Sequence, residues 1–399
     1  MQGSKEYDAI VVGGGPAGST CARFLRQRGF EVAVLDRAEF PRVKLCAGWL
    51  SEPVWDALDL APSDYPRGLW PWERCHVVFG GERHTARVRG YFIRRYEFDD
   101  FLLRESGADL WLGRGVKRLE RTPDGRWSVD GELEARYLIG AGGTHCPVAR
   151  AITARKPLAP VGVQEHEFQA DAAEVKDTRI GGDGEPELLL HDDLRGYSWN
   201  VPKTDWVNIG CGTVAAREVR AAWRSARDYF EARGGVPPGA AGELDRVKGH
   251  SYYLFHPEHL ATAQRDGALL VGDALGLAHP LTAEGIYPGV LSARLAAEAI
   301  AAGEPESYPA RLEAHPALAA FELVFLARQL GAQLSRGAAP RRAPRPAARL
   351  GRAALAHGFA HLFAGGKVPA AHLARRAARI ASRAASRGVS PAPRGDRGA

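Results

Sequence analysis

The sequence predicts an α/β protein with a Rossmann-like domain, an inserted β-rich domain and a helical C-terminal region. Residues 7–37 have the order strand, glycine turn, helix, strand, which is typical of a parallel βαβ unit. The same order returns at residues 267–300, with an apolar strand, a Gly-Asp turn and a second helix. Between these segments, residues 161–254 are richer in strand-forming and turn residues, and this change of pattern indicates a second domain.

The domain boundaries follow these changes of pattern. We place the Rossmann-like domain in residues 1–68, 95–160 and 262–308, the β-rich domain in residues 69–94 and 161–261, and a basic helical region with a disordered tail in residues 309–399. Residues 70–89 alternate between apolar and polar side chains and turn at Gly80 and Gly81, so we expect a β-hairpin there. Further helices are expected near residues 221–233 and 286–302.

The glycine turn of the first unit has the spacing of a dinucleotide-binding loop. Gly13, Gly15 and Gly18 form the pattern G-x-G-x-x-G directly after an apolar strand. The first glycine permits a tight turn, the second lets a pyrophosphate approach the backbone, and the third allows close packing of helix on strand. The helix begins at Pro16, and its free N–H groups favour a phosphate at this end. Asp36, at the tip of the next strand, can accept hydrogen bonds from both ribose hydroxyls.

A second turn, far along the chain, selects the cofactor. An apolar strand ends in Gly272 and Asp273, which places a carboxylate at the sheet edge within reach of a ribityl hydroxyl. Gly276 and Gly285 let the backbone approach a flat ring system. The helix beginning near Ile286 points its positive end at the side of a flavin where negative charge develops on reduction. A nicotinamide cofactor has no ribityl chain, so the two turns together predict FAD.

Composition and cysteine usage exclude several classes of protein. The chain has 399 residues, of which 45% are hydrophobic and 25% charged, as in ordinary globular proteins. The five cysteines contain no C-x-x-C pair, which argues against a zinc site or a disulfide framework and fits a reducing cytosol. No apolar run is long enough to predict a membrane span. We find no second glycine fingerprint, so we expect a transient electron donor: NAD(P)H, a ferredoxin or another reduced flavin.

Four segments carry recognisable motifs: the first 37 residues, the segment Arg95-x-x-Phe98-Asp99, the turn Gly140–Gly143 and the Gly272-Asp273 turn. Together they resemble the para-hydroxybenzoate-hydroxylase-like superfamily of FAD-dependent oxidoreductases. Within that superfamily the chain is most similar to the geranylgeranyl reductase family. Residues 41–48 resemble the family's loop P-x-x-[YK]-x-C-x-G beside the flavin. Residues 197–212 resemble its signature Y-x-W-x-F-P-x(7,8)-G-x-G, with Val201 in place of the Phe.

The resemblance implies roles for individual residues of these motifs. Cys46, Tyr197 and Trp199 are implied as catalytic residues that face the substrate cavity, with Cys46 either a proton donor or a lining residue. The motifs and the resemblance together assign these residues to FAD binding: Gly13, Gly15, Pro16, Ala17, Gly18, Asp36, Arg37, Lys44, Cys46, Ala47, Gly48, Arg95, Gly142, Gly272, Asp273, Gly276, Pro280, Gly285 and Ile286. Gly142 stands where many superfamily members carry an Asp, so an NAD(P)H contact at that turn stays open.

The expected reaction is reduction of a carbon–carbon double bond in a prenyl chain or another apolar substrate. It needs hydride from reduced FAD and a proton at the neighbouring carbon. Tyr197 and Trp199 offer aromatic faces that stabilise developing positive charge, and Cys46 carries an ionisable thiol. Two alternatives stay open: a flavin-dependent monooxygenase or halogenase acting on a small aromatic or natural-product substrate, and a non-catalytic FAD-binding protein. Halogenases favour W-x-W-x-I-P, whereas this chain begins the motif with Tyr197.

The C-terminal segment differs from the rest of the chain in charge. Residues 321–399 contain 15 Lys or Arg and only two acids, in a chain whose net charge is +6. His372 and several of the arginines after it fall on one helical stripe, which suits contact with anionic lipid. We expect a cytoplasmic protein, with peripheral contact to the inner membrane surface through this segment as an open alternative. The segment lacks interleaved aromatic residues, so no specific nucleic-acid partner is expected.

Overall fold

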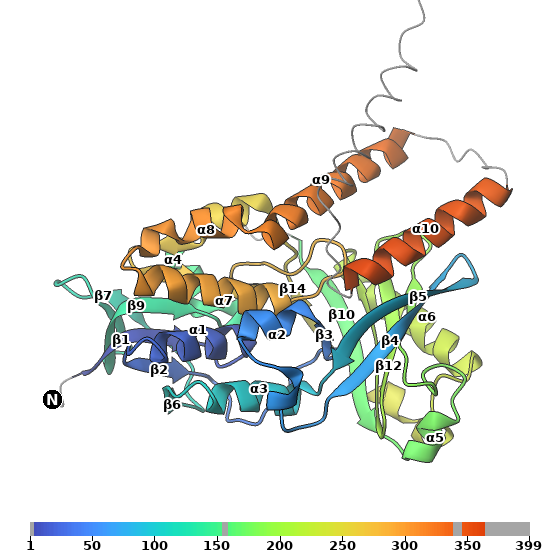
Figure 1. Ribbon diagram of the computed structural model, residues 1–399, viewed down its shortest axis with the longest axis horizontal. Helices are drawn as coiled ribbons and strands as arrows, with labels where there is room; N and C mark the ends of the chain where they lie inside the picture. The colour runs from blue at the N-terminus through green and yellow to red at the C-terminus, as the bar shows by residue number, and fades with distance from the viewer. Residues whose placement is uncertain (1–3, 154–158, 338–344, 364–399) are drawn as a thin grey trace, which may run out of the picture. The chain divides into compact units, whose positions relative to one another are not determined.

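Two β-sheets organise the described part of the chain (Figure 1). A computed structural model describes residues 4–153, 159–337 and 345–363. The basic helical stripe expected at residues 372–387 lies outside these residues. In the part of the chain that is described, no helix is both long enough and apolar enough to cross a bilayer.

The first sheet is mostly parallel, with the strand order β15-β16-β9-β1-β2-β6. Its strands are β1 (Lys5–Val12), β2 (Val32–Leu35), β6 (Asp109–Trp111), β9 (Leu133–Gly140), β15 (Gln264–Arg265) and β16 (Ala268–Leu270), extended beside β9 by β8 (Trp127–Val129) and β7 (Leu119–Arg121). Ile10 of β1 pairs with Ala33 of β2 and with Leu138 of β9. Residues 9–12 are buried throughout, as expected of a central parallel strand. This is the Rossmann-like arrangement that the two βα patterns predict.

Three helices reach the carboxyl edge of this sheet: α1 (Pro16–Arg26), α3 (Arg95–Arg104) and α7 (Ile286–Ala301). Helix α1 packs against both α3 and α7. The tight turn before α1 needs glycine, because a Cβ at Gly18 would lie 1.8 Å from the carbonyl oxygen of Gly13, whose own φ is +117°. The other helices of this half are α2 (Pro53–Leu58), α4 (Pro147–Ile152), α8 (Tyr308–Ala314) and α9 (Pro316–Gly337). The buried Tyr308 hydroxyl donates to the Leu270 carbonyl and ties α8 to β16.

The second sheet has the order β14-β10-β13-β12-β11-β4-β5-β3 and curls into a half-barrel (Figure 1). Its strands are β3 (Trp49–Ser51), β4 (Trp70–Phe79), β5 (Glu82–Phe92), β10 (Val161–Gln169), β11 (Glu187–Leu190), β12 (Gly196–Lys203), β13 (Trp206–Thr213) and β14 (Lys248–Tyr252). Neighbouring strands are antiparallel except for β11 and β4. The hairpin expected around Gly80 and Gly81 is the β4–β5 pair.

Helices cover parts of this second sheet. Helix α6 (Val219–Ala232), expected at residues 221–233, packs on β13 and β10 through the buried Trp223 and Phe230. Helix α10 (Arg345–Phe363) packs on β4 and β5, and its Phe359 is buried. The short helix α5 (Ala172–Lys176) follows β10. The curled sheet thus has helices from the chain's middle and from its C-terminal region against it.

The α/β fold class is confirmed, and the exact domain boundaries stay a prediction. One strand before the boundary that we drew at residue 68 belongs to the second sheet. Trp49 of β3 pairs with Phe92 of β5, so β3 joins the second sheet although it lies within the first segment assigned to the Rossmann-like domain. The chain therefore passes from one sheet to the other directly after Cys46, and the loop that carries this thiol lies between the two sheets.

Candidate functional site

A cavity of about 580 Å³ lies between the carboxyl edge of the first sheet and the curled second sheet. Its wall combines segments that are far apart in sequence. The first sheet contributes the turns after β1, β2, β9 and β16 together with the starts of α1 and α7. The second sheet contributes side chains of β10, β11, β12 and β14, and the Cys46 loop lies between the two groups.

The end of the cavity beside β1 and β2 is built for a ribose and a pyrophosphate. Asp36 accepts a hydrogen bond from the Gly14 N–H at one carboxylate oxygen (2.8 Å) and from the Ala38 N–H at the other (2.9 Å). These two bonds fix the carboxylate and leave lone pairs on both oxygens for ribose hydroxyls. Gly13 and Gly15 line the cavity where α1 begins, and no side chain caps the first N–H groups of that helix. The backbone there is available to an anion.

A buried cluster of charges stands beside this end. The guanidinium of Arg95 donates to both oxygens of Asp99, with Nε–Oδ1 at 2.5 Å and a second bond of 2.7 Å. Asp99 is completely buried and also lies 3.2 Å from Arg42. Burial opposes the charge of Arg95, yet the Asp99 carboxylate outweighs it and raises the pKa of Arg95. Two guanidinium groups share one carboxylate, so a net positive charge faces the cavity.

The Gly272-Asp273 turn and the start of α7 form another part of the cavity wall, beside the start of α1. Asp273, Gly285 and Ile286 all line the cavity. Burial raises the pKa of Asp273 above its ordinary value, while Lys44 and Arg95 oppose that rise. Helix α7 has no side-chain cap on its first N–H groups, so its positive end is open to a ligand. These are the features that predict a flavin-binding turn from sequence.

The second sheet presents an aromatic surface to the cavity. Tyr197 and Trp199 both line it, with ring centroids 5.8 Å apart. The hydroxyl of Tyr197 donates to the Thr282 carbonyl at 2.6 Å, which ties β12 to the loop before α7. Burial raises the pKa of Tyr197, so its hydroxyl stays protonated. Phe359 of α10 packs edge-on against Tyr197 at 5.4 Å, so the C-terminal region contributes to the packing behind this surface.

The Cys46 loop is attached to the same aromatic surface. The Trp199 indole N–H donates to Asn208 Oδ1 at 2.7 Å, and the Asn208 amide donates to the Cys46 carbonyl at 3.3 Å. The Cys46 Sγ accepts a hydrogen bond from the Gly48 N–H at 3.3 Å. Lys44 lines the cavity beside Cys46, and burial together with the charge of Arg95 lowers the pKa of Lys44. The loop therefore holds a thiol and an ammonium against the cavity.

Most of the residues implied in cofactor binding or catalysis line this cavity, and four do not. Those that line it are Gly13, Gly15, Pro16, Ala17, Asp36, Arg37, Lys44, Cys46, Ala47, Arg95, Gly142, Tyr197, Trp199, Gly272, Asp273, Gly285 and Ile286. Gly18 instead packs α1 on the turn at Gly13, and Gly48 lies against the Ile93 carbonyl. Gly276 lies against the ring of His259, and the Pro280 carbonyl accepts a hydrogen bond from Arg328. The assignment of these four to the cofactor stays a prediction.

Several cavity residues escaped the sequence analysis. Arg42, Glu165, His250 and Glu284 line the cavity, and all four carry ionisable side chains. Arg42 stands within the Cys46 loop motif, so that motif could have identified it as a cavity residue. Glu165 and His250 lie on two neighbouring strands that pair only in the folded chain, and no local pattern marks them.

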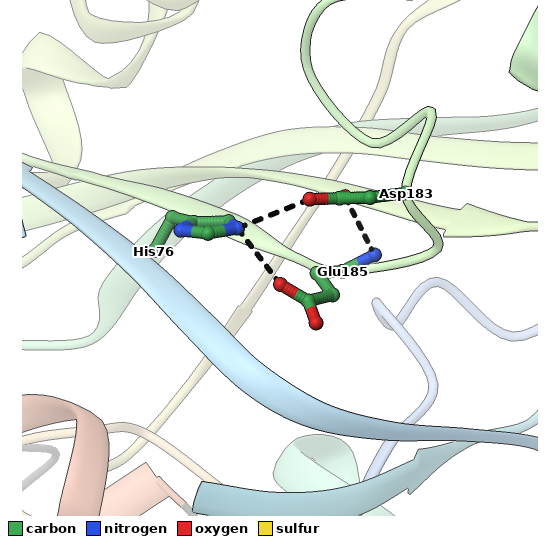
Figure 2. Close-up of side chains that lie close together, drawn as sticks. All are labelled: His76, Asp183 and Glu185. Carbon is green, nitrogen blue, oxygen red and sulfur yellow. Dashed lines mark hydrogen bonds and ion pairs between the residues drawn. The ribbon is translucent and has the colours of Figure 1, made fainter. Parts of the chain in front are cut away.

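A separate cluster of possible metal ligands lies outside this cavity. His76, Asp183 and Glu185 place one ligand atom each within 4.8 Å of one another (Figure 2). His76 Nε2 lies 3.0 Å from Glu185 and 3.4 Å from Asp183, and its Nδ1 bonds the Thr85 hydroxyl. Arg74 donates to the other oxygen of Glu185 at 2.5 Å. Because a guanidinium already neutralises this carboxylate, we interpret the cluster as ion pairing that holds residues 183–185 on β4.

The cavity fits FAD. Two helices, α1 and α7, begin at it with uncapped N–H groups. Two carboxylates line it as well, Asp36 for a ribose and Asp273 for a ribityl chain. A Cβ at Gly285 would lie 3.1 Å from the Asp273 carboxylate, so the glycine keeps the backbone close to that acid. Asp36, the Gly13–Gly15 turn, Asp273 and the start of α7 are the parts that would hold the cofactor.

Comparison with known proteins agrees with a dinucleotide-binding Rossmann-like unit at the start of the chain. Residues 11–43 match the family model described as an NAD(P)-binding Rossmann-like domain. An uncharacterised protein of Methanosarcina barkeri is 30% identical over 319 residues, which cover 75% of this chain and 76% of that protein. Digeranylgeranylglycerophospholipid reductase 1 of Methanothermobacter thermautotrophicus is 26% identical over 327 residues, which cover 75% of this chain and 78% of that protein.

Solved structures share the fold at lower identity. A geranylgeranyl bacteriochlorophyll reductase-like protein from Thermoplasma acidophilum superposes with a TM-score of 0.62 at 20% identity, covering 81% of this chain and 88% of that one. The myxobacterial chondrochloren halogenase CndH superposes with a TM-score of 0.63 at 20% identity, covering 92% of this chain and 98% of that one. Reductases and halogenases thus share one architecture with this chain.

The fold and the site define an FAD-dependent oxidoreductase of the superfamily that contains geranylgeranyl reductases and para-hydroxybenzoate-hydroxylase-like enzymes. This class is common to the reductases and the halogenases that resemble the chain. Within the FAD/NAD(P)-binding Rossmann superfamily, the chain belongs to the same family as the uncharacterised Methanosarcina barkeri protein.

Proposed function

We propose that this protein is a geranylgeranyl-reductase-type enzyme, which reduces carbon–carbon double bonds of a prenyl or other apolar substrate. The observation that carries the proposal is the hydrogen-bonded series from Trp199 through Asn208 to the Cys46 carbonyl. It joins the two motifs by which the sequence resembles geranylgeranyl reductases, although they are far apart along the chain. Both motifs then face one cavity.

The wall on the side of the second sheet suits an apolar substrate. Val163, Leu188, Trp199 and Tyr252 line it, and they come from four different strands. An apolar wall with few polar groups binds hydrocarbon by burying its surface, and the polar groups set its orientation. A prenyl chain offers such a surface along its whole length.

The chemistry divides between the cofactor and the chain. When bound and reduced, FAD supplies hydride. The chain's own residues bind the apolar substrate, exclude water and supply a proton to the second carbon of the double bond. Positive charge that develops at the other carbon, which receives the hydride, is stabilised by the faces of Tyr197 and Trp199. Tyr197 and Trp199 act as catalytic residues in this proposal, and the Cys46 thiol lines the same cavity.

The electron donor and the location of the enzyme belong to the same proposal. NAD(P)H, a ferredoxin or another reduced flavin would deliver electrons transiently to bound FAD. A cytoplasmic enzyme with a basic C-terminal segment could approach a prenylated lipid at an anionic membrane surface. Vesicle sedimentation before and after truncation at Pro340 tests the membrane contact, and equal binding by both forms would contradict it.

An anaerobic single turnover tests the reaction. Chemically reduced enzyme is mixed with geranylgeranyl diphosphate or a geranylgeranylated lipid, and product is followed by mass spectrometry with flavin absorbance in parallel. We expect saturated product to form in step with reoxidation of the flavin. Absence of a saturated product from every prenyl substrate would contradict the proposal.

A monooxygenase or halogenase is the second candidate. The observation that favours it is the similarity in fold to the halogenase CndH over nearly the full length of both chains. Such an enzyme needs oxygen, so the same reduced protein is mixed with air and small aromatic substrates, with halide present and absent. Hydroxylated or halogenated product, together with no anaerobic reduction of prenyl substrates, would favour this second class.

A further inference from the structure

Glu165 is a buried acid in the middle of the cavity wall that no motif marks. It lies at the centre of β10 with 1% of its surface exposed, and it lines the cavity. Its Oε2 atom is buried and has no hydrogen-bond partner among the described residues. An unpaired buried carboxylate oxygen costs free energy, whereas a neutral carboxyl group costs much less.

The strand register places Glu165 beside the aromatic surface. Glu165 pairs with Gly210 of β13, and Gly210 pairs in turn with Trp199 of β12. Directly paired residues of antiparallel strands point to the same face of a sheet, so these three positions form one row across the cavity wall. A Cβ at Gly210 would lie 2.3 Å from the Trp199 ring and 2.7 Å from the Glu165 Cβ. The indole therefore lies over the glycine, against the glutamate.

Cationic and acidic groups face Glu165 from each neighbouring element. Lys44 and the Cys46 backbone approach from the loop, and Lys203 approaches from β12. Lys203 already bonds Glu167 at 2.5 Å, so its charge is met by another carboxylate. On β14, Lys248 pairs with Glu165, and His250 lies two residues further along.

The protonation states of the two neighbouring groups on this face follow from burial. Burial raises the pKa of Glu165 to about 8, although Lys44 and Lys203 oppose the rise. Burial lowers the pKa of His250 to about 3, so the imidazole is neutral at physiological pH. Glu165 is therefore protonated at neutral pH, whereas the neutral imidazole of His250 carries no additional proton that it could donate.

We propose that Glu165, which forms one row with Gly210 and Trp199 on the cavity wall, is the proton donor of the reduction. This inference rests on the proposed function. The O–H bond of Glu165 breaks while the π electrons of the double bond form a C–H bond at one carbon. Hydride forms the second C–H bond at the other carbon, so the alkene is reduced and reduced FAD is oxidised. The carboxylate left behind faces Lys44 and regains a proton from water.

Cys46 takes a different part in this scheme. Its Sγ already accepts a hydrogen bond from the Gly48 N–H, and its carbonyl holds Asn208. The thiol lines the cavity and positions the loop, and the loop in turn places Lys44 opposite Glu165.

Infrared difference spectra of the FAD-loaded protein test the protonation of Glu165 without any substrate. The spectrum of wild type minus Glu165→Gln should show the carbonyl band of a protonated carboxylic acid, and the band should disappear as the pH rises through about 8. The matched control is Glu187→Gln. Glu187 is equally buried but lies outside the cavity and is paired with Arg83 and Tyr229, so this variant should keep both the band and the activity. A band retained in Glu165→Gln would overturn the inference.

Anaerobic single turnovers then test the transfer. Glu165→Gln should lose ~10²–10⁴-fold in rate, as expected when a general acid is removed, with its flavin content and circular dichroism unchanged. Glu165→Asp keeps the acid and should recover part of the rate, and Cys46→Ser should lose less than Glu165→Gln. Glu165→Gln with the wild-type rate and the wild-type pH profile would also overturn the inference. If wild type reduces no prenyl substrate, the proposed function fails, and the infrared arm still decides whether Glu165 holds a proton.

Discussion

The two glycines of the G-x-G motif on β13 should differ sharply in their tolerance of a methyl group. At Gly210 an added Cβ would lie 2.3 Å from Cζ2 and 2.6 Å from Cε2 of Trp199, and 2.7 Å from the Glu165 Cβ. Ordinary carbon contacts are about 3.5–4.0 Å, so the indole must move by about 1 Å or more. Its N–H bond to Asn208 at 2.7 Å resists this movement. At Gly212 the nearest atoms lie 3.6–3.9 Å away, which leaves room for the methyl group.

We therefore expect Gly210→Ala to destabilise the protein by about 1–3 kcal/mol, the range for overpacking, with up to a further ~1 kcal/mol if the Trp199 hydrogen bond is lost. Gly212→Ala should be neutral or stabilising by ~0.4–1 kcal/mol, because alanine reduces the entropy of the unfolded chain. Urea unfolding midpoints of both variants are compared at the same FAD saturation, since bound cofactor adds stability. Equal midpoints would refute the packing argument, and so would a Trp fluorescence spectrum unchanged in Gly210→Ala.

Three further predictions concern the charged groups of the site. Asp36→Ala should weaken FAD binding by about 1–3 kcal/mol, measured by titration of the apoprotein, because the ribose hydroxyls lose their acceptor. Asp99→Asn should lower the unfolding free energy by ~3–5 kcal/mol, because it leaves buried guanidinium charge unpaired. The control Asp100→Asn removes only an exposed i,i+4 ion pair with Arg104 and should cost below ~0.5 kcal/mol. Similar losses in the two variants would contradict the prediction. Burial lowers the folded-state pKa of His279 to about 3, so below pH ~6.5 the folded state binds fewer protons than the unfolded state. The unfolding free energy should therefore fall as the pH drops below ~6.5. His279→Asn should make the unfolding free energy depend less on pH in this range, and an unchanged dependence would contradict the prediction.

The nucleotide end of the site could be predicted because its residues are neighbours in sequence. The glycine turn and Asp36 belong to one βαβ unit, and their spacing follows from backbone geometry alone. The backbone bonds from Gly14 and Ala38 to Asp36 are local as well. The turn at Asp273 was found for the same reason, since a strand, a Gly-Asp pair and a helix follow one another without interruption.

The other wall of the cavity could be predicted only in part. The Tyr197/Trp199 motif was recognised, and the reason for its spacing became clear only from the β12–β13 register, which sets Trp199 opposite Gly210. Glu165 was missed because β10 joins this row through long-range pairing, and a single Glu in a strand has no distinguishing pattern. Gly276 was assigned to the flavin because glycine suits close approach, and that role stays a prediction; a Cβ added there would lie 2.8 Å from the ring of His259.

The order of strands in the first sheet has a consequence for how the protein is made. On the ribosome β1 is synthesised first, but it becomes a central strand only after β9 has emerged. Strand β9 in turn gains its partner β16 only after residues 268–270 have emerged. The Gly13 turn is therefore translated long before the Asp273 turn that completes the same cavity, with more than half of the chain between them. A nascent chain that stops before β16 exposes an apolar strand edge and has no complete cofactor site. Supply of FAD therefore matters most late in synthesis, and C-terminal truncations before residue 289 should accumulate as aggregates and bind no flavin.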